Sequence, residues 1–295
     1  MPGCSTPGIF FIFDESYNTI EISKEMDIAK RDSICIVVNS TAFYLLAYLS
    51  VFLLFQFATI IASNAFDIPN TLYYNRIGFN VKPEAWTFDS VKVIYSAGNI
   101  LLFLLSVSFL VIIVKALEYN GLLRMFFIWA FVHSISMLFG SFVIGAFNFE
   151  GFGIVMSYLY LADTAKMLIL FIGLIILLGI GMSMVKVFLF SANSYFNFLS
   201  PKMRSAFRRD QFMLPFLIST VILLFIKYPI SLYDTLILFM PVFMLLPLYW
   251  GINRYPVFYF EETPKSINIS YRLVLITLGA ITVYRAVLGI GINIG

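Results

Sequence analysis

The stretch "CIVVNSTAFYLLAYLSVFLLFQFATIIA", residues 35–62, contains no charged side chain. The hydrocarbon core of a bilayer is about 30 Å thick and a helix rises about 1.5 Å per residue, so about 20 apolar residues can span it. This stretch is long enough, and it therefore predicts a transmembrane helix.

Further stretches of the same kind follow along the chain. Hydrophobic residues make up 61% of the sequence, charged residues 12%, and the mean hydropathy is +0.93. A soluble domain carries about 25% charged residues. We therefore expect an all-α fold, a polytopic transmembrane helical bundle of about seven spans, with six to eight compatible with the pattern. The other expected spans are 93–115, 125–147, 166–190, 212–228, 234–250 and 271–293.

The charges outside these spans predict an orientation. Residues 1–33 form a charged tail, residues 34–295 the transmembrane domain, and the longest polar connection covers about 63–92. If the N-terminus is inside, thirteen Lys and Arg residues fall on inner segments and five on outer ones. Cytoplasmic loops are enriched in Lys and Arg. The count predicts a cytoplasmic tail, an extracytoplasmic loop at 63–92 and an outer C-terminus.

The only histidine, His133, lies within the third expected span. A zinc protease helix needs two histidines four residues apart, whereas "HSISM" (133–137) offers one. Ser136 lies one turn away, which makes a Ser–His dyad conceivable. Ser136 with Gly140, and Ser141 with Gly145, are small residues at a spacing that lets membrane helices approach closely. We therefore interpret His133 and Ser136 as helix-interface residues, with a proton-relay role left open, and expect no catalytic residue, metal or cofactor.

Arg285 lies deep in the last expected span, where an isolated cation is costly. Four explanations remain open. The side chain extends outward to the membrane interface, it forms an ion pair with Asp163, Asp234 or Glu150, it binds an anionic substrate or lipid headgroup, or it contacts a partner subunit. Asp163 is close in sequence to Lys166, and Asp234 to Lys227, at expected helix ends. We interpret these charges as anchors at the water interface.

Two further features are prolines and a basic run. Pro241 and Pro247 interrupt the sixth expected span and Pro215 the fifth, and broken helices often line transport paths. The basic run alternates with Phe and Met, as in a helix lying on an anionic inner leaflet. An acidic partner surface fits equally well, whereas no basic face large enough for nucleic acid is present. The run comprises Lys202, Arg204, Arg208 and Arg209.

The strings "YSAGNILLFLL" (95–105) and "FVHSISMLFGSFVIGAFNFEGFGIVMSYLYL" (131–161) resemble a pattern of uncharacterised multi-pass inner-membrane proteins of bacteria. A His-then-Gly span followed by "GFG" also resembles the first catalytic helix of site-2 proteases, but the glutamate–histidine pair of their zinc motif is missing. The resemblance covers about a quarter of the chain. It implies a bacterial inner membrane and transfers no catalytic residue.

Three functions compete on these observations. The first is a non-catalytic integral membrane protein, an embedded subunit or scaffold of a larger assembly, with the lipid bilayer, anionic lipid at the inner leaflet and other membrane-protein subunits as partners. The second is a transporter or permease with its path at spans five and six and Arg285. The third is an intramembrane enzyme built on His133 and Ser136, which we expect least.

Overall fold

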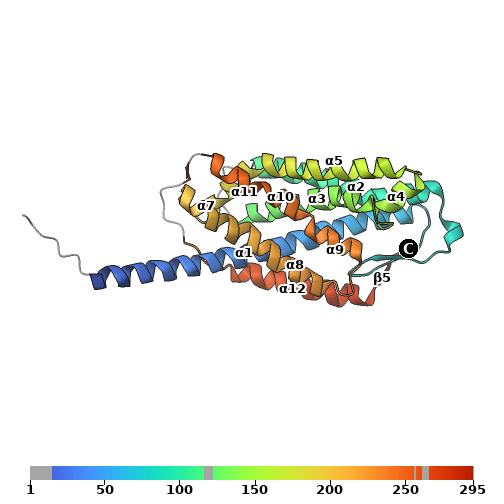
Figure 1. Cartoon of the computed structure of the whole chain (residues 1–295). Coiled ribbons are helices and arrows are strands. Elements are labelled where there is room, and N and C mark those ends of the chain that lie inside the picture. Colours follow the sequence, from blue (N-terminus) through green and yellow to red (C-terminus); the bar gives the residue numbers. More distant parts are fainter. Residues whose placement is uncertain (1–14, 116–121, 256, 261–265, 295) are drawn as a thin grey trace, which may run out of the picture.

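The structure, a computed structural model, describes residues 15–115, 122–255, 257–260 and 266–294. Within that part of the chain, seven helical segments are long and apolar enough to cross a membrane (Figure 1). The expected all-α bundle of seven spans is confirmed, and it is compatible with a multi-pass membrane protein. Residues 1–14 of the expected tail lie outside the described residues. The segments are Lys30–Asn64, Phe88–Lys115, Leu123–Gly145, Asp163–Ser183, Pro201–Ile226, Leu232–Arg254 and Tyr271–Ile290.

Long helices form the bundle and short elements join or interrupt them. The long helices are α1 (Glu15–Asn64), α2 (Phe88–Lys115), α3 (Leu123–Gly145), α5 (Asp163–Ser183), α8 (Leu214–Ile226) and α12 (Tyr271–Ile290). The shorter α-helices are α4 (Phe152–Tyr158), α6 (Val185–Phe190), α7 (Pro201–Arg208), α9 (Leu232–Phe239), α10 (Pro241–Leu245) and α11 (Pro247–Gly251). The 3-10 turns are η1 (Pro83–Ala85), η3 (Ser191–Ser194) and η5 (Ile252–Arg254), and η4 (Arg209–Met213) is a π-helical turn.

Helix α3 is the centre of the bundle. In its apolar segment 83% of the residues are buried, against 17% in α5 and 22% in α12. Small side chains allow this close packing. A Cβ added at Gly140 would lie 2.6 Å from Met240 Cγ, and one at Gly145 would lie 2.7 Å from the Gly153 nitrogen. The outer faces of α2, α5 and α12 carry large exposed apolar side chains, as a lipid-facing surface does.

Prolines break the sixth span where the sequence predicts. Helix α10 begins at Pro241 and α11 at Pro247, because proline lacks the N–H that would continue the preceding helix. In the fifth span, the π-helical turn η4 separates α7 from α8, whose first turn holds Pro215. Span five therefore begins at Pro201, earlier than the expected residue 212.

Short strands lie at both ends of the bundle. Strands β1 (Asn70–Leu72) and β2 (Ile77–Phe79) form a hairpin, and β5 (Ile292–Ile294) pairs antiparallel with β1 to give the order β2-β1-β5. Thr71 lies opposite Asn293, and the Thr71 hydroxyl donates to Asn293 Oδ1 at 2.5 Å. We call this the hairpin end. At the other end, β3 (Phe198–Leu199) pairs with β4 (Phe258–Tyr259), and α1 begins on that side (Figure 1).

Candidate functional site

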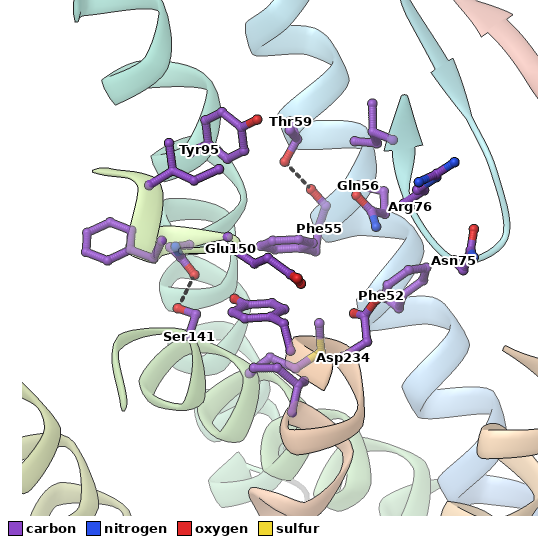
Figure 2. Close-up of a pocket in the computed structure, with 18 of the residues that line it drawn as sticks. Phe52, Phe55, Gln56, Thr59, Asn75, Arg76, Tyr95, Ser141, Glu150 and Asp234 are labelled. Carbon is purple, nitrogen blue, oxygen red and sulfur yellow. Dashed lines mark hydrogen bonds between the residues drawn. The ribbon is translucent and has the colours of Figure 1, made fainter. Parts of the chain in front are cut away.

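A cavity of about 270 Å³ lies between α1, α2, α3, α9 and the β1–β2 hairpin (Figure 2). Its outer opening, which we call the mouth, is a hollow between the hairpin turn, the α3–α4 turn and the α8–α9 turn. The two hollows share the lining residues Asn75, Arg76, Glu150, Gly151, Tyr233 and Asp234.

One face of α1 supplies the aromatic wall of the cavity. Phe52, Phe55, Gln56 and Thr59 recur at three- and four-residue spacing, which places them on the same side of a helix. The ring of Phe55 packs closely against α2 because the facing residue is a glycine: a Cβ at Gly98 would lie 2.3 Å from Phe55 Cε2. The Thr59 hydroxyl donates back to the Phe55 carbonyl at 3.2 Å (Figure 2).

Buried amides line the inner part of the cavity. Gln56 is 7% exposed and Asn99 4% exposed, and both face the cavity. Asn99 Oδ1 accepts a hydrogen bond from Ser141 Oγ at 2.8 Å (Figure 2). Within the described residues, neither Asn99 Nδ2 nor the Gln56 amide has a hydrogen-bond partner. Because these amide groups line the cavity and have no partner in the described part of the protein, they are available to bind water or a ligand there.

An ion pair between α8 and α9 lies at the edge of the cavity. Lys227 Nζ is 3.4 Å from Asp234 Oδ1 and 3.2 Å from the Tyr48 hydroxyl, and it lies 4.0 Å from the centroid of the Phe52 ring. Lys227 is 1% exposed and therefore does not lie at the water interface. The interpretation of Lys227 as an interfacial anchor was wrong. Ser231 caps α9 by accepting from the Asp234 N–H at 3.1 Å, which fixes Asp234 in the first turn.

The hairpin wall of the cavity is held from α12. The Arg285 guanidinium lies 3.6 Å from the centroid of the Tyr74 ring and donates to the Tyr228 carbonyl at 3.2 Å. The Tyr284 hydroxyl donates to the Tyr74 carbonyl, and Asn75 Nδ2 to the Pro229 carbonyl at 2.8 Å. Among the described residues, Arg285 forms no ion pair with Asp163, Asp234 or Glu150, so the ion-pair explanation does not hold.

His133 lies outside the cavity, in the packed centre. It is 2% exposed, and its ring centroid is 4.3 Å from that of Tyr44 and 5.4 Å from that of Tyr48. The Ser136 hydroxyl donates to Met244 Sδ at 3.5 Å, so the two residues form no hydrogen-bonded dyad. No group of three or more His, Cys, Asp or Glu side chains suited to a metal ion occurs in the part of the chain that the structure describes.

The remaining predicted charges are dispersed. Asp163 is 95% exposed and lies 3.6 Å from Lys166 at the start of α5, away from the cavity. In the basic run, Lys202 is exposed and Arg209 is paired with Asp210 at 2.6 Å. Arg208 lies over the Tyr249 ring at 3.8 Å.

The position of Arg204 contradicts the prediction that it contacts anionic lipid or a partner. It is 1% exposed and donates to the carbonyls of Ile252 at 3.1 Å and Tyr255 at 2.9 Å. Its guanidinium thus satisfies carbonyl groups at the end of the broken sixth span, as cations near helix C-termini do. Arg204 cannot contact a lipid surface in this arrangement.

The sequence interpretation missed Gln56, Asn99 and Arg76 as site residues. A signal was present in the first span, because Gln56 and Thr59 are polar residues within an apolar run and share a face with Phe52 and Phe55. Asn99 is likewise a polar residue within an expected apolar span, 93–115, whereas Arg76 lies in the polar connection and joins the cavity only through tertiary packing.

No protein-family model, curated protein or solved structure matches the chain. The resemblance to bacterial inner-membrane proteins therefore stays a prediction from the sequence.

Proposed function

We propose that the chain is an integral membrane protein that binds a small polar molecule in the hairpin-end cavity, as a transporter or permease does. The observation that supports it best is the pair of buried amides, Gln56 and Asn99, which face the cavity without partners for their N–H groups. A polar residue buried in a transmembrane segment is costly and generally serves a function. A protein that acted only as a scaffold would need no such groups.

The broken sixth span gives the proposal a second support. Helix α9 contributes Tyr233, Asp234 and Ile237 to the cavity and ends just before Pro241. Substrate sites of many transporters are formed by such discontinuous helices. A Cβ at Gly181 of α5 would lie 2.4 Å from the Met244 carbonyl of α10, so the next segment is held separately against α5.

Orientation and location belong to the same proposal. With the N-terminus inside a bacterial inner membrane, as the distribution of Lys and Arg predicts, the mouth faces the extracytoplasmic side. Arg285 then has an architectural role, because it holds the hairpin wall and does not line the cavity. A subunit role in a larger assembly remains compatible with this function, but no feature of the cavity requires it.

Binding to the purified protein tests the proposal. The protein in lipid nanodiscs is heated with a panel of amino acids, amines, carboxylates, sugars and nucleosides, and compounds that raise the melting temperature are assayed for uptake into proteoliposomes. Thr59→Trp fills the cavity and should abolish both effects. Phe57→Trp on the exposed face of the same helix is the matched control and should retain them. Stabilisation that survives Thr59→Trp would place binding elsewhere and contradict the proposal.

A further inference from the structure

The charges around the cavity are arranged in two sets. Of the described residues that line it, Arg76, Glu150 and Asp234 are charged. Asp234 is neutralised locally, because Lys227 Nζ lies 3.4 Å from its carboxylate. This pair is an internal feature of the protein and leaves no net charge for a ligand to balance.

Arg76 and Glu150 are different, because neither has an ion-pair partner within the part of the chain that the structure describes. Both line the cavity and the mouth. Arg76 belongs to the hairpin turn, whereas Glu150 comes from the α3–α4 turn and extends into the cavity from the other side (Figure 2). The mouth therefore presents one positive and one negative side chain from separate walls, both exposed and neither engaged in an ion pair within the described part of the protein.

We propose that the ligand of this cavity is a small zwitterion, with an acidic group for Arg76 and an ammonium group for Glu150. This inference rests on the proposed function, because it assigns a chemical class to the molecule bound there. Gln56 and Asn99, with their free amide N–H groups, would meet polar atoms of the ligand that reach the inner cavity.

Electrostatics disfavours a ligand with a single charge. An amine would gain from Glu150 and lose from Arg76, and a carboxylate would do the reverse, whereas a zwitterion satisfies both. A volume of about 270 Å³ can hold a molecule of amino-acid size.

The test compares probes of equal shape. L-leucine, 3-methylbutylamine and 4-methylpentanoate share one apolar side chain but carry two, one and one charged groups. L-phenylalanine, phenethylamine and 3-phenylpropanoate form a second series. Binding to the full chain in nanodiscs of phosphatidylglycerol is measured by calorimetry and by melting temperature. We expect the zwitterion of at least one series to bind about tenfold more tightly than either singly charged analogue, the effect of one lost charge-assisted contact.

Two single variants and their controls assign the groups. Arg76→Gln should weaken the zwitterion by about tenfold and bring its affinity close to that of the amine, and Glu150→Gln should do the same relative to the carboxylate. Lys82→Gln and Glu84→Gln are the controls, because these exposed charges follow the hairpin and do not line the cavity. Both variants should leave the affinity for the zwitterion unchanged. The double variant Arg76→Glu with Glu150→Arg exchanges the charges, and it should regain part of the zwitterion binding.

The outcomes separate this inference from the proposed function. If an amine or a carboxylate binds as tightly as the zwitterion, or if only sugars or nucleosides bind, the zwitterion inference is wrong while the binding function stands. If no compound of either panel binds, both fail. Adding phosphatidylethanolamine to the nanodisc distinguishes a lipid from a solute. If this lipid competes with the soluble probe, the natural zwitterion is a lipid headgroup, and if it does not compete, the natural zwitterion is a solute. Either result supports the inference.

Discussion

Lys227 and Asp234 form an ion pair of unequal burial, since the lysine side chain is 1% exposed and the aspartate side chain 21% exposed, with 3.4 Å between Nζ and Oδ1. The lysine is enclosed by Tyr48 and Phe52, whereas the aspartate opens to the cavity. Water in the cavity can therefore solvate the carboxylate but not the ammonium.

Asp234→Asn should destabilise the protein more than Lys227→Met. Removing the carboxylate leaves the lysine charge buried without a partner, which costs about 3 kcal/mol, whereas removing the lysine leaves a carboxylate that water still reaches. Thermal unfolding in detergent of both variants and of Lys227→Met with Asp234→Leu measures this. The double variant should recover stability relative to Asp234→Asn, and an equal loss in both single variants would show that burial does not determine the cost.

Gly181→Ala should destabilise the contact between α5 and α10 by about 1–3 kcal/mol, the usual cost of overpacking. The added Cβ would lie 2.4 Å from the Met244 carbonyl oxygen, a backbone atom that cannot move aside alone. Gly179→Ala on the same helix is the control, because no atom lies within 4 Å of a Cβ there. It should be neutral or slightly stabilising. Equal melting temperatures for the two variants would contradict the tight approach.

Arg285→Leu should loosen the hairpin without unfolding the bundle. The variant loses the contact with the Tyr74 ring and the hydrogen bond to the Tyr228 carbonyl, each worth about 1 kcal/mol. Hydrogen–deuterium exchange should therefore accelerate in residues 70–80 and remain slow in α3. Arg272→Leu, an exposed position at the start of α12, should leave exchange in the hairpin unchanged.

His133→Phe should retain stability to within about 1 kcal/mol and retain ligand binding. The variant loses a hydrogen bond to the Tyr44 backbone, worth about 1 kcal/mol. It also removes Nε2, which has no hydrogen-bond partner among the described residues, and a phenyl ring preserves the edge-to-face contacts with Tyr44 and Tyr48. Melting temperature and ligand affinity test this together. Loss of binding in a folded His133→Phe protein would favour the proton-relay role over packing.

A small water-soluble methanethiosulfonate reagent should modify Thr59→Cys and spare Phe57→Cys, in a chain whose Cys4 and Cys35 are replaced by serine. Thr59 lines the cavity, whereas Phe57 is 44% exposed on the apolar outer surface. Thiolates react only where water reaches them. Modification rates in intact membranes measure the difference, and prior addition of a bound ligand should slow the reaction at residue 59.

The seven spans could be predicted from the sequence because their signal is local: each is a continuous apolar run. The breaks at Pro241 and Pro247 could be predicted as well, because proline interrupts a helix at its own position in the sequence. The span bounds were less predictable where amphipathic sequence continues a helix. Helix α7, which contains Lys202, Arg204 and Arg208 of the basic run, extends span five, although its polar residues give the segment the pattern of a surface helix.

The cavity could not be predicted because its groups come from segments far apart in the chain. Arg76 and Asp234 become neighbours of the same hollow only after the hairpin and α9 have assembled. The sequence marks Lys227 and Asp234 as charges near helix ends, but it does not tell which of them faces water. That distinction depends on Tyr48, on another span, which encloses the lysine.

The pairing of β1 with β5 imposes an order on biosynthesis. The hairpin leaves the ribosome directly after the first span, yet the groups that hold it arrive with the fifth span at Tyr228 and with the seventh at Arg285 and β5. Until those late segments insert, the hairpin is held only by early segments, through hydrogen bonds from Asn70 to the end of α1 and contacts of Phe79 with Trp86 and Tyr95. The hairpin therefore reaches its final set of contacts only when the last helix is in place.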